Sequence, residues 1–221
     1  LGMALAAGGA SVLIADGDMR YPCAAPVDGC GEERIYTLEE ARKGACRVKQ
    51  AVIEHPTRPN LSFLPCAGCR ERAYISIAIK EAGSAFDYVL CDRAARDICR
   101  RGIVVCEPYP LSIRLADMCL NELRDGGYSE LDVIFNKVNG GLIYDRAIAP
   151  PEDVAELLHA GLAGVIPEDL TMPLGGMRRE SVRAFKLAAA RVAGGGRKVF
   201  DPNRGYGGAY GYLKRAMRKK L

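Results

Sequence analysis

Short apolar runs that end in acidic residues recur along this chain and predict strands. Ser11–Ala15 and Tyr88–Cys91 are apolar without the alternation of a half-exposed strand, as expected of strands buried on both faces of a parallel sheet. The first run leads into Asp16 and Asp18, and the second leads into Asp92. Because ligands gather at the carboxyl ends of strands in open α/β sheets, these acids predict a site for Mg²⁺ and a nucleotide.

The rest of the pattern alternates between helical and strand-like segments. Thr37 begins a helix, because Glu40 follows it at the spacing of a capping box. Helices are also expected over residues 1–7, 71–83, 111–123, 151–159 and 181–192, and strands over 61–64, 102–106, 131–135 and 164–166. Proline and glycine predict a loop over 19–36 and a break over 55–60. This order predicts an α/β fold, a doubly wound and mostly parallel sheet with helices on both faces.

Length and composition set the class of protein. The 221 residues are enough for one domain with a substantial core. Hydrophobic residues make up 49% of the chain, and no apolar run has the length of a membrane span. The first residues lack the basic lead of a secretory signal. Leu1–Ala7 resembles the end of a helix, so we expect that a preceding segment is missing from this chain.

The net charge of +4 is unevenly distributed. From Arg178 onward there are thirteen Lys or Arg and two Asp or Glu, a balance of +11 that leaves −7 for the preceding part. A concentration of positive charge at one end indicates an anionic surface as the partner, rather than a basic fold throughout.

The C-terminal segment combines glycine, apolar residues and cations. Residues 194–211 are glycine-rich and predict a flexible linker, and residues 212–221 predict an amphipathic basic tail. Tyr210, Leu213, Met217 and Leu221 are spaced as one stripe of a helix. The other faces carry five cations, Lys214, Arg215, Arg218, Lys219 and Lys220. This composition is typical of an interfacial helix on anionic lipid, and the alternative is a disordered basic end.

Six short segments occur in an order and spacing that resemble a known family. The segments are Val12–Asp18, Asn60–Pro65, Phe86–Asp92, Ser112–Asp117, Glu152–Val154 and Gly164–Asp169. Together they are similar to the MinD septum-site-determining ATPases of the deviant Walker A (ParA/MinD) class, over about residues 1–177 and through the tail. The resemblance implies a P-loop NTPase-like fold over residues 1–193, truncated so that it lacks the first strand and the P-loop.

The resemblance also implies a role for each matching residue. Asp16 and Asp18 match the acids that organise Mg²⁺ and the attacking water, and Asp92 matches the Walker B aspartate that holds Mg²⁺ through water. Asn136 matches the residue that reads adenine, whereas its place in the sequence alone favours a turn residue after a strand. The loop beside the base is matched by Pro167, Glu168 and Asp169. Carboxylates suffice for phosphoryl transfer when cationic groups also hold the phosphates.

Cofactors, partners and location follow from the same resemblance. It implies ATP and Mg²⁺ as cofactors and an ATP-dependent homodimer that places the division septum. It implies a cytoplasmic protein bound peripherally to the anionic inner face of the cytoplasmic membrane by its tail, from Leu213 to Leu221. MinC-like and MinE-like division-site regulators are the implied protein partners, and no nucleic acid is expected.

Two departures from the family concern the phosphates. The family's Lys-Gly-Gly-x-Gly-Lys-Thr-Thr loop has no counterpart, since Gly-Lys-Ser/Thr occurs nowhere in these 221 residues. The family's Asp-Ser/Thr-Pro-Ala-Gly is here Asp92-Arg93-Ala94-Ala95-Arg96. We therefore expect this chain to bind ATP poorly, as a truncated copy of the family or as an inactive one.

The nine cysteines support a rival hypothesis. Cys66 and Cys69 form a Cys-x-x-Cys pair, which is half of a zinc site. Cys99 lies seven residues after Asp92, at the distance found in the nitrogenase iron protein of the same class, where a cysteine binds an iron–sulfur cluster. The alternatives are thus an iron–sulfur relative, an inactive binding module, or incidental reduced thiols. His55 and His159 are expected on the surface.

Overall fold

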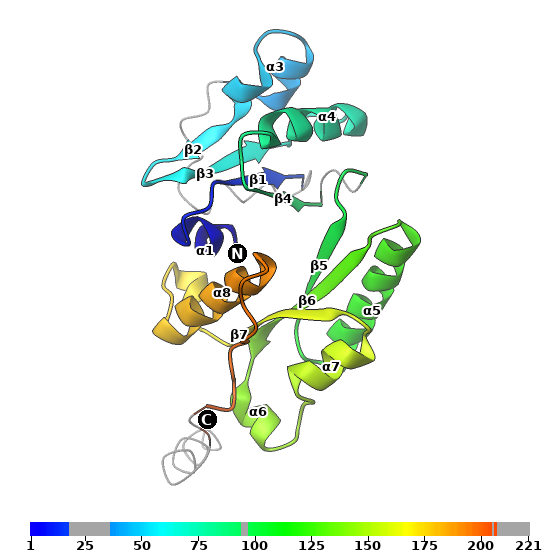
Figure 1. Cartoon of the computed structure of the whole chain (residues 1–221), viewed down its shortest axis with the longest axis vertical. Helices are drawn as coiled ribbons and strands as arrows, with labels where there is room; N and C mark the ends of the chain where they lie inside the picture. The colour runs from blue at the N-terminus through cyan, green and yellow to red at the C-terminus, as the bar shows by residue number, and fades with distance from the viewer. Residues whose placement is uncertain (18–35, 94–96, 205, 207–221) are drawn as a thin grey trace. The chain divides into compact units, whose positions relative to one another are not determined.

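The computed structural model describes residues 1–17, 36–93, 97–204 and 206 (Figure 1). Two compact units make up the chain, Leu1–Cys99 and Arg100–Leu221, and each has its own sheet. The expected loop over 19–36, except Tyr36, lies outside the described residues, as do Asp18 and the tail from 212 to 221. The predicted α/β class is confirmed, with mostly parallel sheets and flanking helices, but the strands form two sheets where one was expected.

The first unit contains a four-stranded sheet. Its strands, in spatial order, are β2 (Ile53–His55), β3 (Arg58–Pro65), β1 (Val12–Asp16) and β4 (Tyr88–Asp92). The last three strands are parallel, and β2 pairs antiparallel with β3. The helices are α1 (Gly2–Ala7), α3 (Leu38–Arg42), the 3₁₀ turn η1 (Val48–Ala51) and α4 (Arg72–Gly83).

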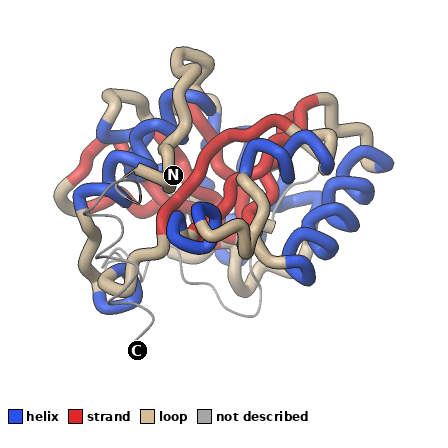
Figure 2. The backbone as a smooth tube through the Cα atoms, turned by 90° about the horizontal axis from the view of Figure 1, so that it is seen from below, coloured by secondary structure: helices blue, strands red, loops and turns tan. Residues whose placement is uncertain are grey.

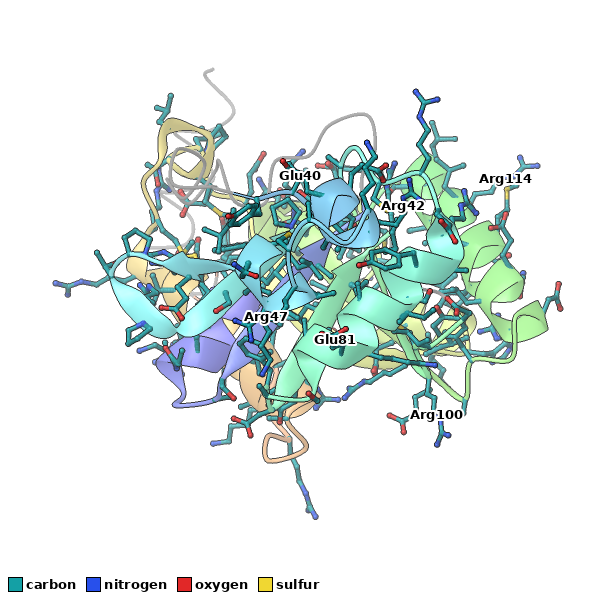
Figure 3. The ribbon with its side chains drawn as sticks, turned by 90° about the horizontal axis from the view of Figure 1, so that it is seen from above. Glu40, Arg42, Arg47, Glu81, Arg100 and Arg114 are labelled. Atoms are coloured by element: carbon teal, nitrogen blue, oxygen red, sulfur yellow. The ribbon has the colours of Figure 1, made fainter. Side chains whose placement is uncertain are left out.

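Helices cover both faces of this sheet, because side chains of parallel strands alternate between faces. Leu13 and Val89 belong to the apolar cluster that includes α3 and α4. Ile14 and Leu90 face α1, where they approach Gly2 so closely that a Cβ there would lie 2.7 Å from Ile14. The helix α3 carries Glu40 (Figure 3). It begins as expected: Thr37 Oγ1 accepts from the Glu40 amide and the Glu40 carboxylate accepts from the Thr37 amide.

The second unit contains a three-stranded parallel sheet. Its strands, in spatial order, are β5 (Arg101–Cys106), β6 (Glu130–Val138) and β7 (Gly161–Pro167). Its helical segments are α5 (Pro110–Asp125), α6 (Gly140–Tyr144), α7 (Pro151–Leu157), the 3₁₀ turn η2 (Met172–Leu174) and α8 (Arg179–Val192). The helices α5 and α7 share a buried cluster with the strands, and α8 packs on β7 through Gly164 and Ala188. Figure 2 shows helices in blue beside strands in red.

Three sequence predictions for the first unit were wrong in detail. The break expected over 55–60 is a two-residue turn of a hairpin, because β3 begins at Arg58 and pairs with β2. His55 is buried rather than on the surface: its Nδ1 accepts from the Thr57 amide at 3.2 Å, and its ring stacks on Phe63. The strand β4 is half-buried instead of buried on both faces, because it is the last strand of its sheet. His159 is exposed, as predicted.

The glycine-rich segment differs from the expected linker in its described part. Val199 and Phe200 pack against the apolar cluster of the second unit, and Pro202 is buried. A Cβ on Gly140 would collide with the Pro202 carbonyl, so glycine is needed where this segment crosses the start of α6. Apolar burial of Val199 and Phe200 thus stabilises this part of the segment on the second unit. Among the described residues, no helix is long and apolar enough to cross a membrane.

Candidate functional site

The strands β1 and β4 bring Asp16 and Asp92 to the same edge of the first sheet. The two residues are register partners in the parallel pairing of these strands. The Gly17 amide donates to the Asp92 carbonyl at 2.8 Å, and the Cys66 amide donates to the Asp16 carbonyl at 2.8 Å, so both strand ends are held by backbone hydrogen bonds. The sequence prediction that two strands deliver acids to one edge is thus confirmed for this pair. Asp18 lies outside the described residues.

The two acids differ in their surroundings. Asp16 is only 3% exposed, whereas Asp92 is exposed. Oxygen ligands of this kind suit Mg²⁺, which keeps most of its waters and takes one or two carboxylates plus substrate phosphates. Within the part of the chain that the structure describes, no three His, Cys, Asp or Glu side chains are grouped to hold a metal. The exposed Asp92 carboxylate at the end of β4 fits a hydrated Mg²⁺ that a phosphate would complete.

The residue after Asp92 has an unusual backbone conformation. Arg93 lies in the left-handed region with φ of 54°. A non-glycine residue pays about 1–2 kcal/mol for this conformation. The chain therefore bends at Arg93, directly after the acid. Residues 94–96, which complete the departure from the family pattern, lie outside the described residues.

Polar side chains also meet at the carboxyl ends of the second sheet. Lys137 on β6 binds Glu107 after β5, with Nζ and Oε1 2.6 Å apart. This ion pair raises the pKa of Lys137. Asn139 after β6 donates to Oε2 of Glu168 after β7 at 2.7 Å, and its own Oδ1 accepts from the Gly141 amide at the start of α6. The ends of all three strands are thus linked by side chains.

Asn136 lies within β6 rather than after it, because the strand extends three residues beyond its expected end to Val138. The register shifts between Phe135 and Val138, and Lys137 has a positive φ of 53°. Asn136 is half-buried, and its side chain has no hydrogen bond to any other described residue. Adenine reading by Asn136 stays a prediction.

The three residues expected beside the base have different surroundings. Pro167 ends β7 and is half-buried, Glu168 is exposed, and Asp169 is buried. The Asp169 carboxylate accepts from the Thr171 hydroxyl and amide, the Arg178 amide and the Ser181 hydroxyl. These donors, first the Thr171 hydroxyl, hold the pKa of Asp169 well below its usual range. Asp169 thus fastens the loop to the start of α8, and any contact of this loop with a nucleotide stays a prediction.

Sequence patterns did not identify three polar residues at the edge of the second sheet: Glu107, Lys137 and Asn139. Glu107 stands directly after an apolar strand and before Pro108, which is the same signal that identified Asp92. Asn139 precedes Gly140 in a pattern typical of a helix N-cap, although α6 is too short for periodicity to reveal it. The family's phosphate-binding loop has no counterpart among the 221 residues, and the roles of Asp16, Asp92 and Asn136 toward a nucleotide stay predictions.

Comparison with known sequences finds relatives of one kind. No protein-family model matches the chain. It is 29% identical over 183 aligned residues to a MinD-named septum site-determining protein of Guillardia theta, in an alignment that covers 76% of this chain and 68% of that protein. It is 28% identical over 246 alignment positions to the corresponding protein of Mesostigma viride. That alignment covers 98% of this chain and 84% of that protein.

Comparison with solved structures gives the same fold. The MinD cell division protein of Aquifex aeolicus superposes with a TM-score of 0.78 at 22% identity, covering 90% of each chain. That protein in its complex with MinC gives a TM-score of 0.78 at 20% identity, covering 89% and 88%. A cobyrinic acid a,c-diamide synthase of Mycobacterium smegmatis, solved with an ATP analog and magnesium, gives 0.57 at 16% identity, covering 86% and 85%. The P-loop NTPase-like fold expected from the sequence is thus confirmed.

Proposed function

Because this chain is a relative of the MinD/ParA-family ATPases, we propose that it is a MinD-like switch protein. In this role it binds the cytoplasmic membrane as an ATP-dependent dimer and takes part in placing the division septum. The single observation that carries the proposal is the pairing of Asp16 with Asp92 at the ends of neighbouring parallel strands. Relatives with this fold include a protein solved with an ATP analog and magnesium, which supports the choice of ligand.

The chain's own residues would divide the work between the metal and the base. Asp92 is exposed and would hold Mg²⁺ through water, while buried Asp16, with Asp18 two residues later, would orient the attacking water. Bound Mg²⁺ would neutralise charge on the phosphates. On the second sheet, Asn136 would donate to and accept from the adenine edge. In the family the phosphates are held by the backbone amides and lysine of a Gly-Lys-Ser/Thr loop, a motif that does not occur in the 221 residues.

The tail is proposed as the membrane anchor. A single short helix with five cations gives weak affinity, since each cation near an anionic surface contributes about 1 kcal/mol. Two tails on one dimer gain avidity, because the second binds as an intramolecular event. Nucleotide-driven dimerisation would thereby control membrane binding.

A partner surface of the MinC or MinE kind is proposed on α5. Leu111, Leu115 and Met118 lie at helical spacing and are 72%, 56% and 55% exposed, although each is a large apolar side chain. Arg114 extends outward from the same helix (Figure 3). An apolar row with a cation beside it fits an amphipathic partner segment. The Aquifex aeolicus relative solved in complex with MinC supports a partner of this class.

Nucleotide binding tests the proposal directly. The chain would be compared by calorimetry with a chimera in which a MinD relative's first strand and Lys-Gly-Gly-x-Gly-Lys-Thr-Thr loop precede Leu1. The chimera should bind Mg·ATP roughly a hundredfold more tightly, because the loop adds about 3 kcal/mol of charge-assisted hydrogen bonds. In the chimera, Asp92→Asn should weaken the dependence of binding on Mg²⁺, and Asp18→Ala should abolish turnover without unfolding the protein.

Asp117→Asn is the matched control, since Asp117 is an exposed acid on α5 of the second unit. It should leave binding and turnover unchanged. A well-folded chimera that binds no ATP would sink the proposal. Tight Mg·ATP binding by the 221-residue chain itself would show that the phosphates are held by residues other than a phosphate loop.

A binding module without turnover is the second candidate. The observation that favours it is the lack of Gly-Lys-Ser/Thr anywhere in the 221 residues. The same chimera separates the two candidates: binding of ATP without hydrolysis supports the module, whereas hydrolysis that depends on Asp18 supports the switch.

A further inference from the structure

The outward face of α8, the helix drawn in orange in Figure 1, combines cations with an apolar side chain. The buried side of the helix packs on β7, where Ala188 meets Gly164. The exposed side chains on its other side follow the spacing i, i+3, i+4 and i+7 of a single helical face. They are Arg179, Val182, Arg183 and Lys186. One face of α8 thus belongs to the core, and the other presents a mixed basic and apolar row.

This row lines a shallow hollow together with Met177, which lies just before the helix. No acidic side chain of the described chain lines the hollow. Its three cations form no hydrogen bond or ion pair with any other described residue: Arg179, Arg183 and Lys186. By contrast, the neighbouring Arg178 pairs with Asp169, with Nε and Oδ1 3.6 Å apart. The charges in the hollow are therefore free to bind an anion.

The loop before α8 holds Leu174 out in the solvent, where the residue is 86% exposed. The amides of Leu174 and Gly176 donate to the Thr171 carbonyl at 3.0 and 2.9 Å, so the loop is closed by its own hydrogen bonds. At its base, the Asp169 carboxylate accepts from the hydroxyls of Thr171 and Ser181. Leu174 therefore protrudes because of the shape of a fastened loop.

Leu174 and the hollow belong to the same region of the second unit. Leu174 lies three residues before Met177, and chain geometry keeps their Cα atoms within about 11 Å of each other. We call this region the α8 surface and define it by Leu174, Met177, Arg179, Val182, Arg183 and Lys186. Its apolar side chains gain free energy by leaving water, and its cations by meeting anions. A partner that uses the whole surface must therefore offer both an apolar phase and negative charge.

An anionic bilayer has both properties. At its interface, apolar side chains lie below the headgroups and cations lie among the lipid phosphates. A nucleic acid would engage the cations through its phosphates but would leave Leu174 in water. An amphipathic protein segment needs an apolar groove, whereas Leu174 protrudes. Of these three classes of partner, the bilayer is the one that satisfies both kinds of side chain.

We propose that the α8 surface is a second contact with anionic phospholipid membranes, separate from the tail. Leu174 and Met177 insert below the headgroups, and the three cations of the hollow bind lipid phosphates. The proposed function includes membrane binding through the tail, but this contact rests on neither the tail nor ATP, so either one can fail without the other. Two contacts on one unit also fix its orientation on the membrane, which a single tail on a linker does not.

A single tryptophan reports insertion, because the chain has no tryptophan of its own. Leu174→Trp would be made in the full chain and mixed with vesicles of equal parts phosphatidylglycerol and phosphatidylcholine. We expect its emission to shift to shorter wavelength and to be quenched by brominated lipid. Neither change should occur with vesicles of phosphatidylcholine alone. Adding Leu213→Glu, which weakens the tail, should lower the amount bound but keep the shift of the bound protein.

Leu157→Trp is the matched control. Leu157 is 73% exposed on α7. Val165 of β7 belongs to the apolar cluster that includes α7, whereas the neighbouring Gly164 faces α8. Since successive residues of a strand point to opposite faces of a sheet, α7 and α8 lie on opposite faces. A tryptophan at position 157 should keep the emission of an exposed side chain with every vesicle.

Co-sedimentation with the same vesicles measures how much each kind of side chain contributes. In the full chain carrying Leu213→Glu, the remaining binding should weaken about tenfold on Leu174→Glu, because apolar burial is lost. It should weaken about fivefold on Arg183→Gln and should decrease with added salt. Arg114→Gln is the control for charge, since Arg114 is exposed on α5 and forms no ion pair with another described residue. It should leave binding unchanged.

Circular dichroism would verify that each surface variant is folded. The proposal would be overturned if the full chain pellets with anionic vesicles while the emission of Leu174→Trp stays unchanged, since the tail alone then binds. It would also be overturned if Arg183→Gln weakens binding, Leu174→Glu does not, and duplex DNA displaces the vesicles, because the cations then serve a nucleic acid. If no form pellets and no emission shifts, both this contact and the binding of the tail are wrong.

Discussion

Asp16 and Asp92 are register partners at the carboxyl ends of two parallel strands, yet one is buried and the other is exposed. The pairing places two carboxylates on one edge of a sheet although 75 residues separate them along the chain. Their unequal burial implies that the two side chains contribute differently to stability. This difference can be measured without any ligand.

Asp16→Asn should destabilise the fold more than Asp92→Asn. Replacing a buried carboxylate leaves neighbouring buried polar groups without their partner and without access to water. The expected loss in free energy of unfolding is about 1–3 kcal/mol. The exposed Asp92 should change the free energy of unfolding by less than about 0.5 kcal/mol. Urea unfolding of both variants checks this, with Asp117→Asn as an exposed-acid control. Equal losses at both positions would contradict the assignment of burial.

Asn139 should be coupled to Glu168. Its side chain caps α6 and also donates to the Glu168 carboxylate, so Asn139→Ala should cost about 1 kcal/mol or more. In a double-mutant cycle with Glu168→Gln, the two changes should be non-additive by at least about 0.5 kcal/mol. Glu152→Gln, an exposed acid on α7, is the control and should be additive. If Asn139→Ala and Glu168→Gln are also additive, the Asn139–Glu168 hydrogen bond does not couple the ends of β6 and β7.

His159→Gly should stabilise the protein. His159 follows α7 with φ of 51°, and the amides of His159 and Ala160 donate to the Glu156 and Ala155 carbonyls in the pattern of a Schellman motif. Glycine adopts this conformation without the clash of a Cβ, for a gain of about 0.5–1 kcal/mol. Thermal unfolding measures it, with His159→Ala as the comparison that keeps the Cβ. A lower unfolding temperature for the glycine variant would be the contrary result.

Stability should fall in acid through Asp169. Because the pKa of this carboxyl is lowered in the folded state, its contribution is fully present above the pKa of the unfolded chain, about 3.9. The contribution is lost progressively as the pH falls below about 4 toward the folded pKa. Asp169→Asn should therefore be less stable at pH 7 and should lose less stability between pH 4 and 2. Unfolding curves at several pH values check the sign, and parallel profiles for the two proteins would refute it.

The tail should bind anionic membranes whatever the first unit binds. Leu213 and Met217 should insert below the headgroups, while the five cations lie among the phosphates, so binding should weaken with salt. Leu213→Glu should cost more than Lys214→Gln, because it removes apolar burial and adds repulsion. Co-sedimentation with vesicles containing phosphatidylglycerol measures this, with a chain ending at Gly211 as the control. If all forms pellet equally with the vesicles, the tail does not bind the membrane and is only a solvated basic end.

The chain's local patterns were sufficient to predict most elements and the acids that end them. Thr37 and Glu40 are three residues apart, so their reciprocal hydrogen bonds could be expected from spacing alone. The apolar runs before Asp16 and Asp92 likewise specify strands through side chains within five residues of each other. The resemblance added roles to these acids, and its order of motifs agrees with the fold of the relatives.

Only the tertiary structure decided what depends on contacts between distant segments. The hairpin that buries His55 and the four donors around Asp169 have no local signature. Each arises because backbone pairing and packing bring together residues whose separation along the chain carries no periodic signal. The glycine-rich residues 194–204 also depend on distant contacts. Phe200 packs on an apolar cluster, and most members of that cluster precede it by more than forty residues in the sequence. Sequence thus determined which side chains could act, and packing determined which of them meet.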